Sequence, residues 1–120
     1  MVKSYRDPLI WQQAMELAGV GYMATEKLPD RESYGLTSQL QRAVVSVSSN
    51  IAEGHAREST REYLPSLRTS RGSLAKLETQ LLLCERLKFL SAPDIAQLKI
   101  SDDLGKMIRG VQRSLNEKLN

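Results

Sequence analysis

Two groups of basic side chains, at residues 57–68 and 106–113, are candidates for binding a polyanion. The first group surrounds the expected start of a long helix and consists of Arg57, Arg61 and Arg68. The second group follows helical steps of three and four residues and consists of Lys106, Arg109 and Arg113. Such stripes can contact phosphates without reading a base sequence. Proteins that stack nucleic-acid bases have aromatic residues among the basic ones, and these stripes have none. The alternative interpretation is that both stripes are ordinary solvated helix surface.

The distribution of charge agrees with a polyanionic partner. The net charge at pH 7 is only +3. Residues 1–58 hold six basic and seven acidic residues, whereas residues 59–120 hold eleven and seven. The positive excess therefore lies in the second half, with most of the basic stripes. This asymmetry favours RNA or DNA as a partner, and a chance surplus of arginine on a solvated surface is the alternative.

Residues that could perform catalysis or bind a metal are scarce. His55 is the only histidine, so the Glu-x-x-His pairs of di-iron bundles are absent from the sequence. Cys84 is the only cysteine and falls on an apolar stripe, where cysteine behaves as a small hydrophobe. The sequence also has neither a glycine-rich phosphate loop nor a Gly-x-Ser-x-Gly turn. We expect no catalytic residue, metal or cofactor, and we predict that the protein is not an enzyme. An enzyme would require polar groups that converge inside the fold.

Some polar residues fall near apolar positions and are candidates for structure or assembly. Arg71 and Glu78 are seven residues apart on one side of the third expected helix, and Arg42 lies between apolar positions of the second. Our hypothesis is that Arg42 or Arg71 forms an ion pair with Glu78 that sets the helix register or a subunit contact. The alternative is that these side chains are exposed and contribute little to stability. Ser46 and Asn50 give the second helix a small polar face, which predicts close helix contact within or between subunits.

Long helices must position these side chains. Apolar residues recur at steps of three and four in four segments, approximately 8–28, 36–53, 59–89 and 91–115. The third segment is the one around which the chain is organised, and Ser59 and Glu62 at its start have the spacing of a capping box. Gly54 is predicted to follow the end of the second helix, which places His55 in a loop. The predicted apolar stripes include Ile10, Ala14, Leu17, Leu40, Val44, Val47, Ile51, Leu67, Leu74, Leu77, Leu104 and Ile108.

These four segments predict an all-α fold, an antiparallel up-down-up-down four-helix bundle. A chain of 120 residues is expected to form a single domain, residues 1–120. No apolar run approaches the roughly 18 residues of a membrane span. The first residues lack the hydrophobic stretch of a secretory signal. A cytoplasmic protein without membrane contact is therefore expected.

The segments 34–43, 48–54 and 71–81 resemble the four-helix-bundle proteins encoded in 23S rRNA intervening sequences. The segment 7–12, with Trp11, extends the likeness, which covers essentially the whole chain. The resemblance implies a four-helix bundle that assembles into a homopentamer and has no established enzymatic activity. The accessory proteins of diversity-generating retroelements are similar in form, and they bind nucleic acid and a reverse transcriptase through a basic pentameric barrel.

The leading prediction is a non-enzymatic, oligomeric bundle that binds RNA or DNA weakly and without sequence preference through the two basic stripes. The residues predicted to serve structure or assembly are Trp11, Arg42, Ser46, Asn50, Arg71 and Glu78. The alternative prediction is a structural scaffold that docks another protein and does not bind nucleic acid.

Overall fold

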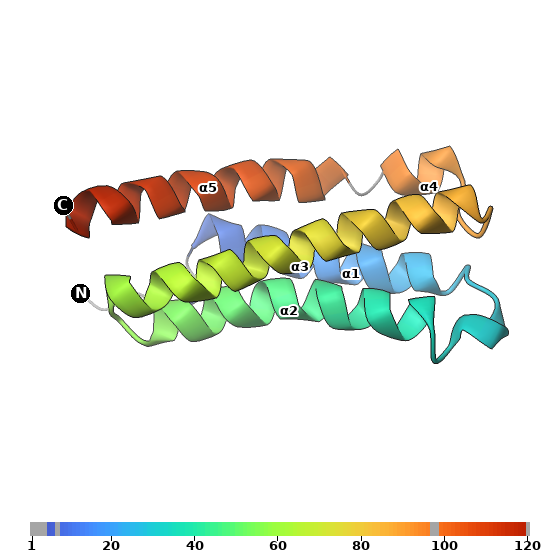
Figure 1. Cartoon of the computed structure of the whole chain (residues 1–120), viewed down its shortest axis with the longest axis horizontal. Coiled ribbons are helices and arrows are strands. Elements are labelled where there is room, and N and C mark those ends of the chain that lie inside the picture. The colour runs from blue at the N-terminus through green and yellow to red at the C-terminus, as the bar shows by residue number, and fades with distance from the viewer. Residues whose placement is uncertain (1–4, 7, 97–98, 120) are drawn as a thin grey trace.

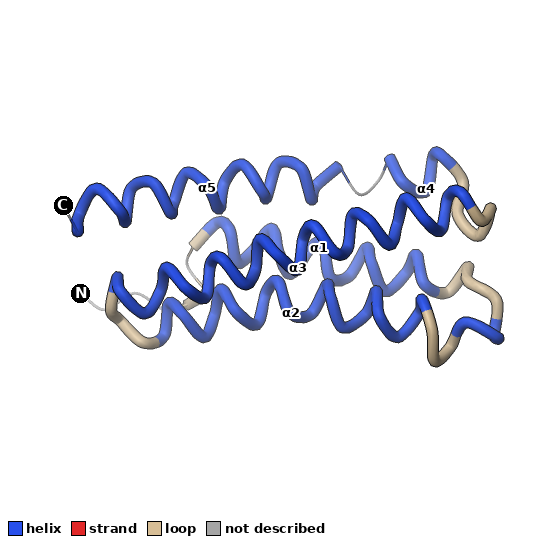
Figure 2. Tube along the Cα trace, in the orientation of Figure 1, coloured by secondary structure: helices blue, strands red, loops and turns tan. Residues whose placement is uncertain are grey.

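Four long α-helices account for most of the chain. The computed structural model describes residues 5–6, 8–96 and 99–119. The elements are α1 (Leu9–Thr25), η1 (Asp30–Glu32), α2 (Leu36–Ala56), α3 (Thr60–Arg86), α4 (Ala92–Ala96) and α5 (Ile100–Leu119). None of the described residues forms a β-strand (Figure 2). The predicted all-α class is confirmed, including for residues 44–51, whose β-branched composition alone would suit a strand.

The long helices lie side by side along a molecule of 47 × 20 × 19 Å (Figure 1). Helix α2 packs against α1 and α3, and α5 packs against the same two helices from the other side. In Figure 1 each long helix runs in the opposite direction to the long helix before it in the chain. The four-helix bundle predicted from the apolar spacing is confirmed. Within the described ranges, no helix combines the length and the apolarity needed to cross a bilayer.

The core lies where the four apolar stripes meet. Every long helix contributes side chains with little or no exposure, which include Leu17, Val44, Val47, Ile51, Leu67, Leu77, Leu104 and Ile108. Burial of one such large aliphatic side chain contributes about 1.5–3 kcal/mol. The spacing of three and four residues therefore identified the core correctly.

Helices α2 and α3 approach each other closely because small residues line their contact. A Cβ atom added at Gly54 would lie 2.6 Å from the Cβ of Ser66. The Ser70 hydroxyl donates to the Val47 carbonyl at 2.8 Å. The prediction that Gly54 follows the end of α2 is wrong, because this glycine is buried inside a helix that continues to Ala56. His55 is consequently helical rather than in a loop, and its ring meets the Tyr63 ring edge to face at 5.6 Å between centroids.

The two ends of α3 differ from the prediction. Ser59 is the N-cap residue, but its side chain makes no capping hydrogen bond, so the expected capping box is wrong. The helix ends at Arg86, before Lys88, which has a φ of 64°. The Phe89 N–H donates to the Cys84 carbonyl at 2.8 Å, and the Lys88 N–H to the Glu85 carbonyl at 3.0 Å. This pattern is a Schellman motif, with a lysine where glycine is usual.

The fourth predicted helix is divided into α4 and α5, so the single helix expected from residue 91 is wrong. Leu98, which was predicted to belong to its apolar stripe, lies outside the described residues. Ser91 and Asp94 do form the predicted start signal. The Asp94 carboxylate accepts hydrogen bonds from the N–H and the hydroxyl of Ser91, each at 2.9 Å. The same carboxylate pairs with Lys27, which ties α4 to the segment after α1.

Candidate functional site

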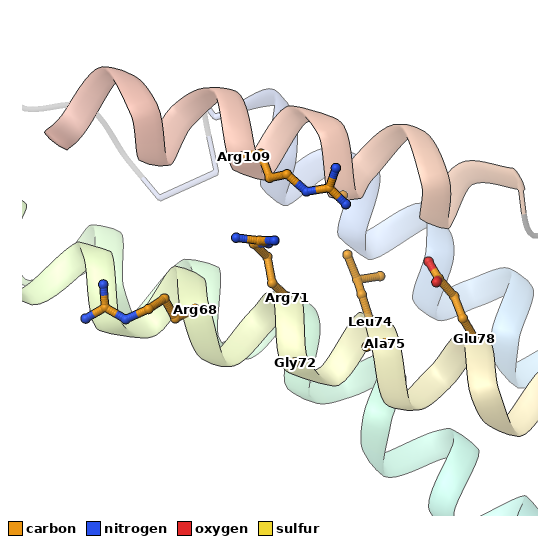
Figure 3. Close-up of a pocket in the computed structure, with 8 residues that line it drawn as sticks. Arg68, Arg71, Gly72, Leu74, Ala75, Glu78 and Arg109 are labelled. Atoms are coloured by element: carbon orange, nitrogen blue, oxygen red, sulfur yellow. The ribbon is translucent and has the colours of Figure 1, made fainter. Parts of the chain in front are cut away.

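A groove between α3 and α5 brings four arginines together. It has two adjoining sections with cavity volumes of about 360 and 500 Å³. Both sections are lined by Arg68, Arg71 and Arg109, and the second also by Arg113. Figure 3 shows Arg71 reaching from α3 towards α5, and Arg109 extending from α5 into the same space. We call these four residues, with Gln112, the arginine groove.

Gln112 holds one member of the arginine groove in place. The side chain of Gln112 is only 8% exposed, and its Oε1 accepts a hydrogen bond from the Arg71 guanidinium at 3.1 Å. A buried amide has few alternative rotamers, so it fixes the side chain that it binds. Arg71 is therefore positioned before any ligand arrives, and its remaining N–H donors can serve an anion.

No arginine of the arginine groove forms an ion pair with a carboxylate among the described residues. In the described part of the chain, ion pairs join Lys27 to Asp94 and Arg57 to Glu53, and none includes a groove arginine. Among the described residues of one chain, neither Arg42 nor Arg71 forms an ion pair with Glu78, so the predicted pairing within the bundle is not found. Arg71 instead binds an amide on a different helix. A pairing between subunits stays a prediction. Glu78 lines one end of the groove and Glu117 the other.

The chemistry that the arginine groove offers is the binding of phosphate. A guanidinium presents N–H donors in a planar fork that matches two oxygens of a phosphate. Four such groups in one groove provide positive charge and also N–H donors with defined orientations. Beside the arginines, the first section is lined by the aliphatic or small residues Gly72, Leu74, Ala75 and Gly105. Neither section is lined by an aromatic residue on which a base could stack.

The structure divides the six predicted basic residues into two sets. Arg68, Arg109 and Arg113 lie in the arginine groove. Arg57, Arg61 and Lys106 have exposed side chains but do not line it. The Arg57 guanidinium donates to the Glu53 carboxylate at 3.1 Å, which offsets part of its charge.

The residues predicted to serve structure or assembly have separate environments. Trp11 is half-buried and packs against the core, and its ring meets the Tyr5 ring at 5.6 Å. The Ser46 hydroxyl lies 2.8 Å from that of Ser73 on α3. Asn50 donates to the Ser46 carbonyl at 2.8 Å, so this polar face joins α2 to α3 within the subunit. Arg42 is exposed on α2.

Two members of the arginine groove were missed by sequence reasoning. Arg71 was assigned to a pair with Glu78, and Gln112 was not selected at all. The sequence does place Arg71 on the helix face that carries Arg68, and Gln112 on the face that carries Arg109, as the one available signal. That signal becomes informative only when the rotation of α3 relative to α5 is known.

The described residues contain no group of three or more His, Cys, Asp or Glu side chains placed to hold a metal ion. Cys84 is buried, and burial raises the pKa of its thiol, with a smaller contribution from Glu32. A buried thiol with a raised pKa is poorly suited to act as a nucleophile.

Comparison with known proteins supports one family. Residues 6–110 match the family described as 23S rRNA-intervening sequence protein. No curated protein matches the chain in a sequence search. The family match spans most of the four-helix bundle, including the groove residues Arg68, Arg71 and Arg109. The chain belongs to the 23S rRNA-intervening sequence protein family.

Proposed function

We propose that this protein binds RNA without sequence preference, through contacts between the arginine groove and phosphate groups. The observation that carries the proposal is that Arg68, Arg71, Arg109 and Arg113 line one groove, with no ion pair to any of them among the described residues. Guanidinium groups that line the same groove repel one another, and an anion bound among them reduces that repulsion. No step of this function requires a reaction, which fits a non-enzymatic helical protein.

The binding mechanism is electrostatic. RNA carries condensed counterions, and each phosphate that a guanidinium neutralises releases counterions into solution. The affinity therefore falls as salt is added. Because no aromatic side chain lines the groove, base identity should have little effect on the affinity. DNA of the same length should bind through the same contacts.

The test is the affinity of a fluorescently labelled single-stranded RNA, measured by anisotropy between about 50 and 200 mM salt. We expect Arg109→Gln to weaken binding more than Lys106→Gln, although both remove one positive charge from α5. Arg42→Gln on α2 is the control for general charge and should have the smallest effect. Affinity that is independent of salt, or equal losses in all three variants, would contradict the arginine groove as the binding site.

We also propose that copies of the chain assemble with one another. Two apolar patches remain exposed on the bundle. One lies near the end of α3 and contains Leu82, which is 59% exposed, with Leu83 and Leu87. The other lies on the outer face of α1 and contains Met23, which is 69% exposed, with Met15 and Tyr22.

The charges that flank these two patches are complementary. Beside the α3 patch, Arg86 and Lys88 outnumber Glu85. Beside the α1 patch, Glu16 and Glu26 outnumber Lys27, which is itself paired with Asp94. Contact between the α3 patch of one copy and the α1 patch of the next is a head-to-tail interaction, which closes into a ring when the rotation permits. Five subunits is the number that the family resemblance implies. A ring would carry one arginine groove on every subunit, so the positive electrostatic potential that attracts RNA would be stronger than for one chain.

Light scattering over a range of protein concentrations tests this assembly. We expect a mass several times the 13.5 kDa of one chain and a shift of Leu82→Glu towards the monomer. Val45→Glu places the same change at an exposed apolar position of α2 outside both patches, and it should leave the mass unchanged. A monomer at all concentrations would contradict the proposal. An assembled protein that passes a heparin column without retention would instead support the protein scaffold over nucleic-acid binding.

A further inference from the structure

The arginine groove is short. Arg71 follows Arg68 by three positions and Arg113 follows Arg109 by four, which correspond to about 4.5 and 6 Å along their helices. The two sections have volumes in the range of sites for small molecules. The arginines on each helix are therefore close enough together to contact one or two phosphate groups, but not a long stretch of backbone.

Carboxylates flank the arginines at both ends of the groove. Glu78 follows Arg71 by seven residues on α3, and Glu117 follows Arg113 by four on α5. The two helices run in opposite directions (Figure 1), so these carboxylates lie towards opposite ends. A nucleic-acid strand that continued along the groove would bring its next phosphates close to Glu78 or Glu117. The resulting repulsion disfavours a strand that extends through the groove in either direction.

We infer that the arginine groove binds a terminal phosphate of an RNA strand. This inference rests on the proposed function and specifies which part of the RNA is bound. A phosphomonoester at a strand end carries about −1.5 to −2 charges near neutral pH, whereas each internal phosphodiester carries one. The terminal group also exposes three oxygens, which can accept hydrogen bonds from several guanidinium groups at once.

The position of Gln112 strengthens this assignment. Its buried amide holds Arg71 on the α3 wall of the groove, opposite the arginines of α5. Figure 3 shows the Arg71 and Arg109 side chains reaching into one space from the two helices. An anion between them would receive hydrogen bonds from both walls, a geometry that suits a compact phosphate group better than a backbone on an open surface.

The experiment compares one single-stranded RNA with a 5′-phosphate and the same RNA with a 5′-hydroxyl, each labelled at the 3′ end. We expect the phosphorylated RNA to bind at least about fivefold more tightly. Arg71→Gln and Arg109→Gln should each reduce this ratio strongly, whereas Arg42→Gln should preserve it. Circular dichroism of each variant shows whether the helices are retained.

Equal affinity for the two RNAs, with binding still sensitive to salt, would overturn the terminal-phosphate assignment and leave the proposed function intact. No measurable binding of either RNA would overturn both. A free nucleoside 5′-monophosphate that binds as tightly as the phosphorylated RNA would assign the groove to mononucleotides and overturn the RNA-end assignment.

Discussion

The Arg71 guanidinium on α3 donates a hydrogen bond of 3.1 Å to the Oε1 of Gln112 on α5. This contact joins residues 41 positions apart in the sequence. It fixes an arginine at the centre of the groove through a neutral partner, so the arginine keeps its full charge for a ligand. An acidic partner would have held Arg71 equally well but would have cancelled that charge.

Replacement of Gln112 tests this positioning without removing an arginine. Gln112→Leu keeps much of the side-chain volume and removes the acceptor, so we expect RNA affinity to fall about threefold as Arg71 loses its anchor. Gln112→Glu should reduce affinity more, by roughly tenfold, because it adds a competing negative charge. Anisotropy titrations provide both values. Unchanged affinity in both variants would show that Gln112 has no role in binding.

Gly54 sets the distance between α2 and α3. Alanine favours a helix by about 1 kcal/mol over glycine, but its Cβ here would lie 2.6 Å from the Ser66 Cβ and 2.9 Å from the Tyr63 ring. We expect Gly54→Ala to destabilise the protein by about 1–3 kcal/mol. Gly110→Ala is the control, since no neighbouring atom lies within 4 Å of its added Cβ, and it should stabilise the fold by up to about 1 kcal/mol. Urea denaturation measures both changes, and a stabilised Gly54→Ala would contradict the close approach of the helices.

Lys88 occupies a backbone conformation that glycine adopts more easily. Its φ of 64° follows the end of α3 in the Schellman motif. Lys88→Gly should raise the free energy of unfolding by about 0.5–1 kcal/mol, because glycine has no Cβ to strain this conformation. Lys76→Gly, an exposed site in the middle of α3, should lower it by about 1 kcal/mol. Thermal and urea unfolding of the two variants should therefore shift in opposite directions; a shift in the same direction would argue against the motif.

The Asp94 carboxyl should titrate unusually low. Its hydrogen bond with Lys27, followed by those with Ser91, lowers its pKa from 3.8 to about 2. The stabilisation from ionised Asp94 is therefore complete above about pH 4 and is lost as the pH falls through 2. Lys27→Met should move the Asp94 pKa back towards 3.8, as measured by NMR titration of the carboxyl carbon. An unchanged pKa would show that Lys27 does not hold this carboxylate in solution.

The bundle could be predicted from the sequence because it depends on the spacing of apolar residues within each helix, which is a local property. Ile10, Ala14 and Leu17 fall on one side of any helix that contains them, and the same holds for the other three stripes. Helix ends were less predictable. Glycine often follows the end of a helix, but Gly54 lies inside α2, where its missing side chain permits close contact with Ser66 of α3. That contact depends on the packing of two helices, which the spacing within one helix does not specify.

The arginine groove was only partly predictable for a related reason. Arg109 and Arg113 share a helix face by spacing alone, so their stripe was identified. Whether that stripe faces solvent, a carboxylate or the arginines of another helix depends on how α5 is rotated against α3. The predicted pair of Arg71 with Glu78 assumed that residues on one helix face bind each other, whereas Arg71 reaches across to Gln112.

The salt dependence of RNA binding by the double variant Arg71→Gln/Arg109→Gln is the most direct test of the arginine groove. For a single strand, each phosphate contact contributes about 0.7 to the slope of log K against log salt concentration. If the two arginines each contact a phosphate, the slope of the double variant should be shallower than that of the wild-type protein by about 1.4. Equal slopes, with both proteins folded, would contradict phosphate binding by the groove.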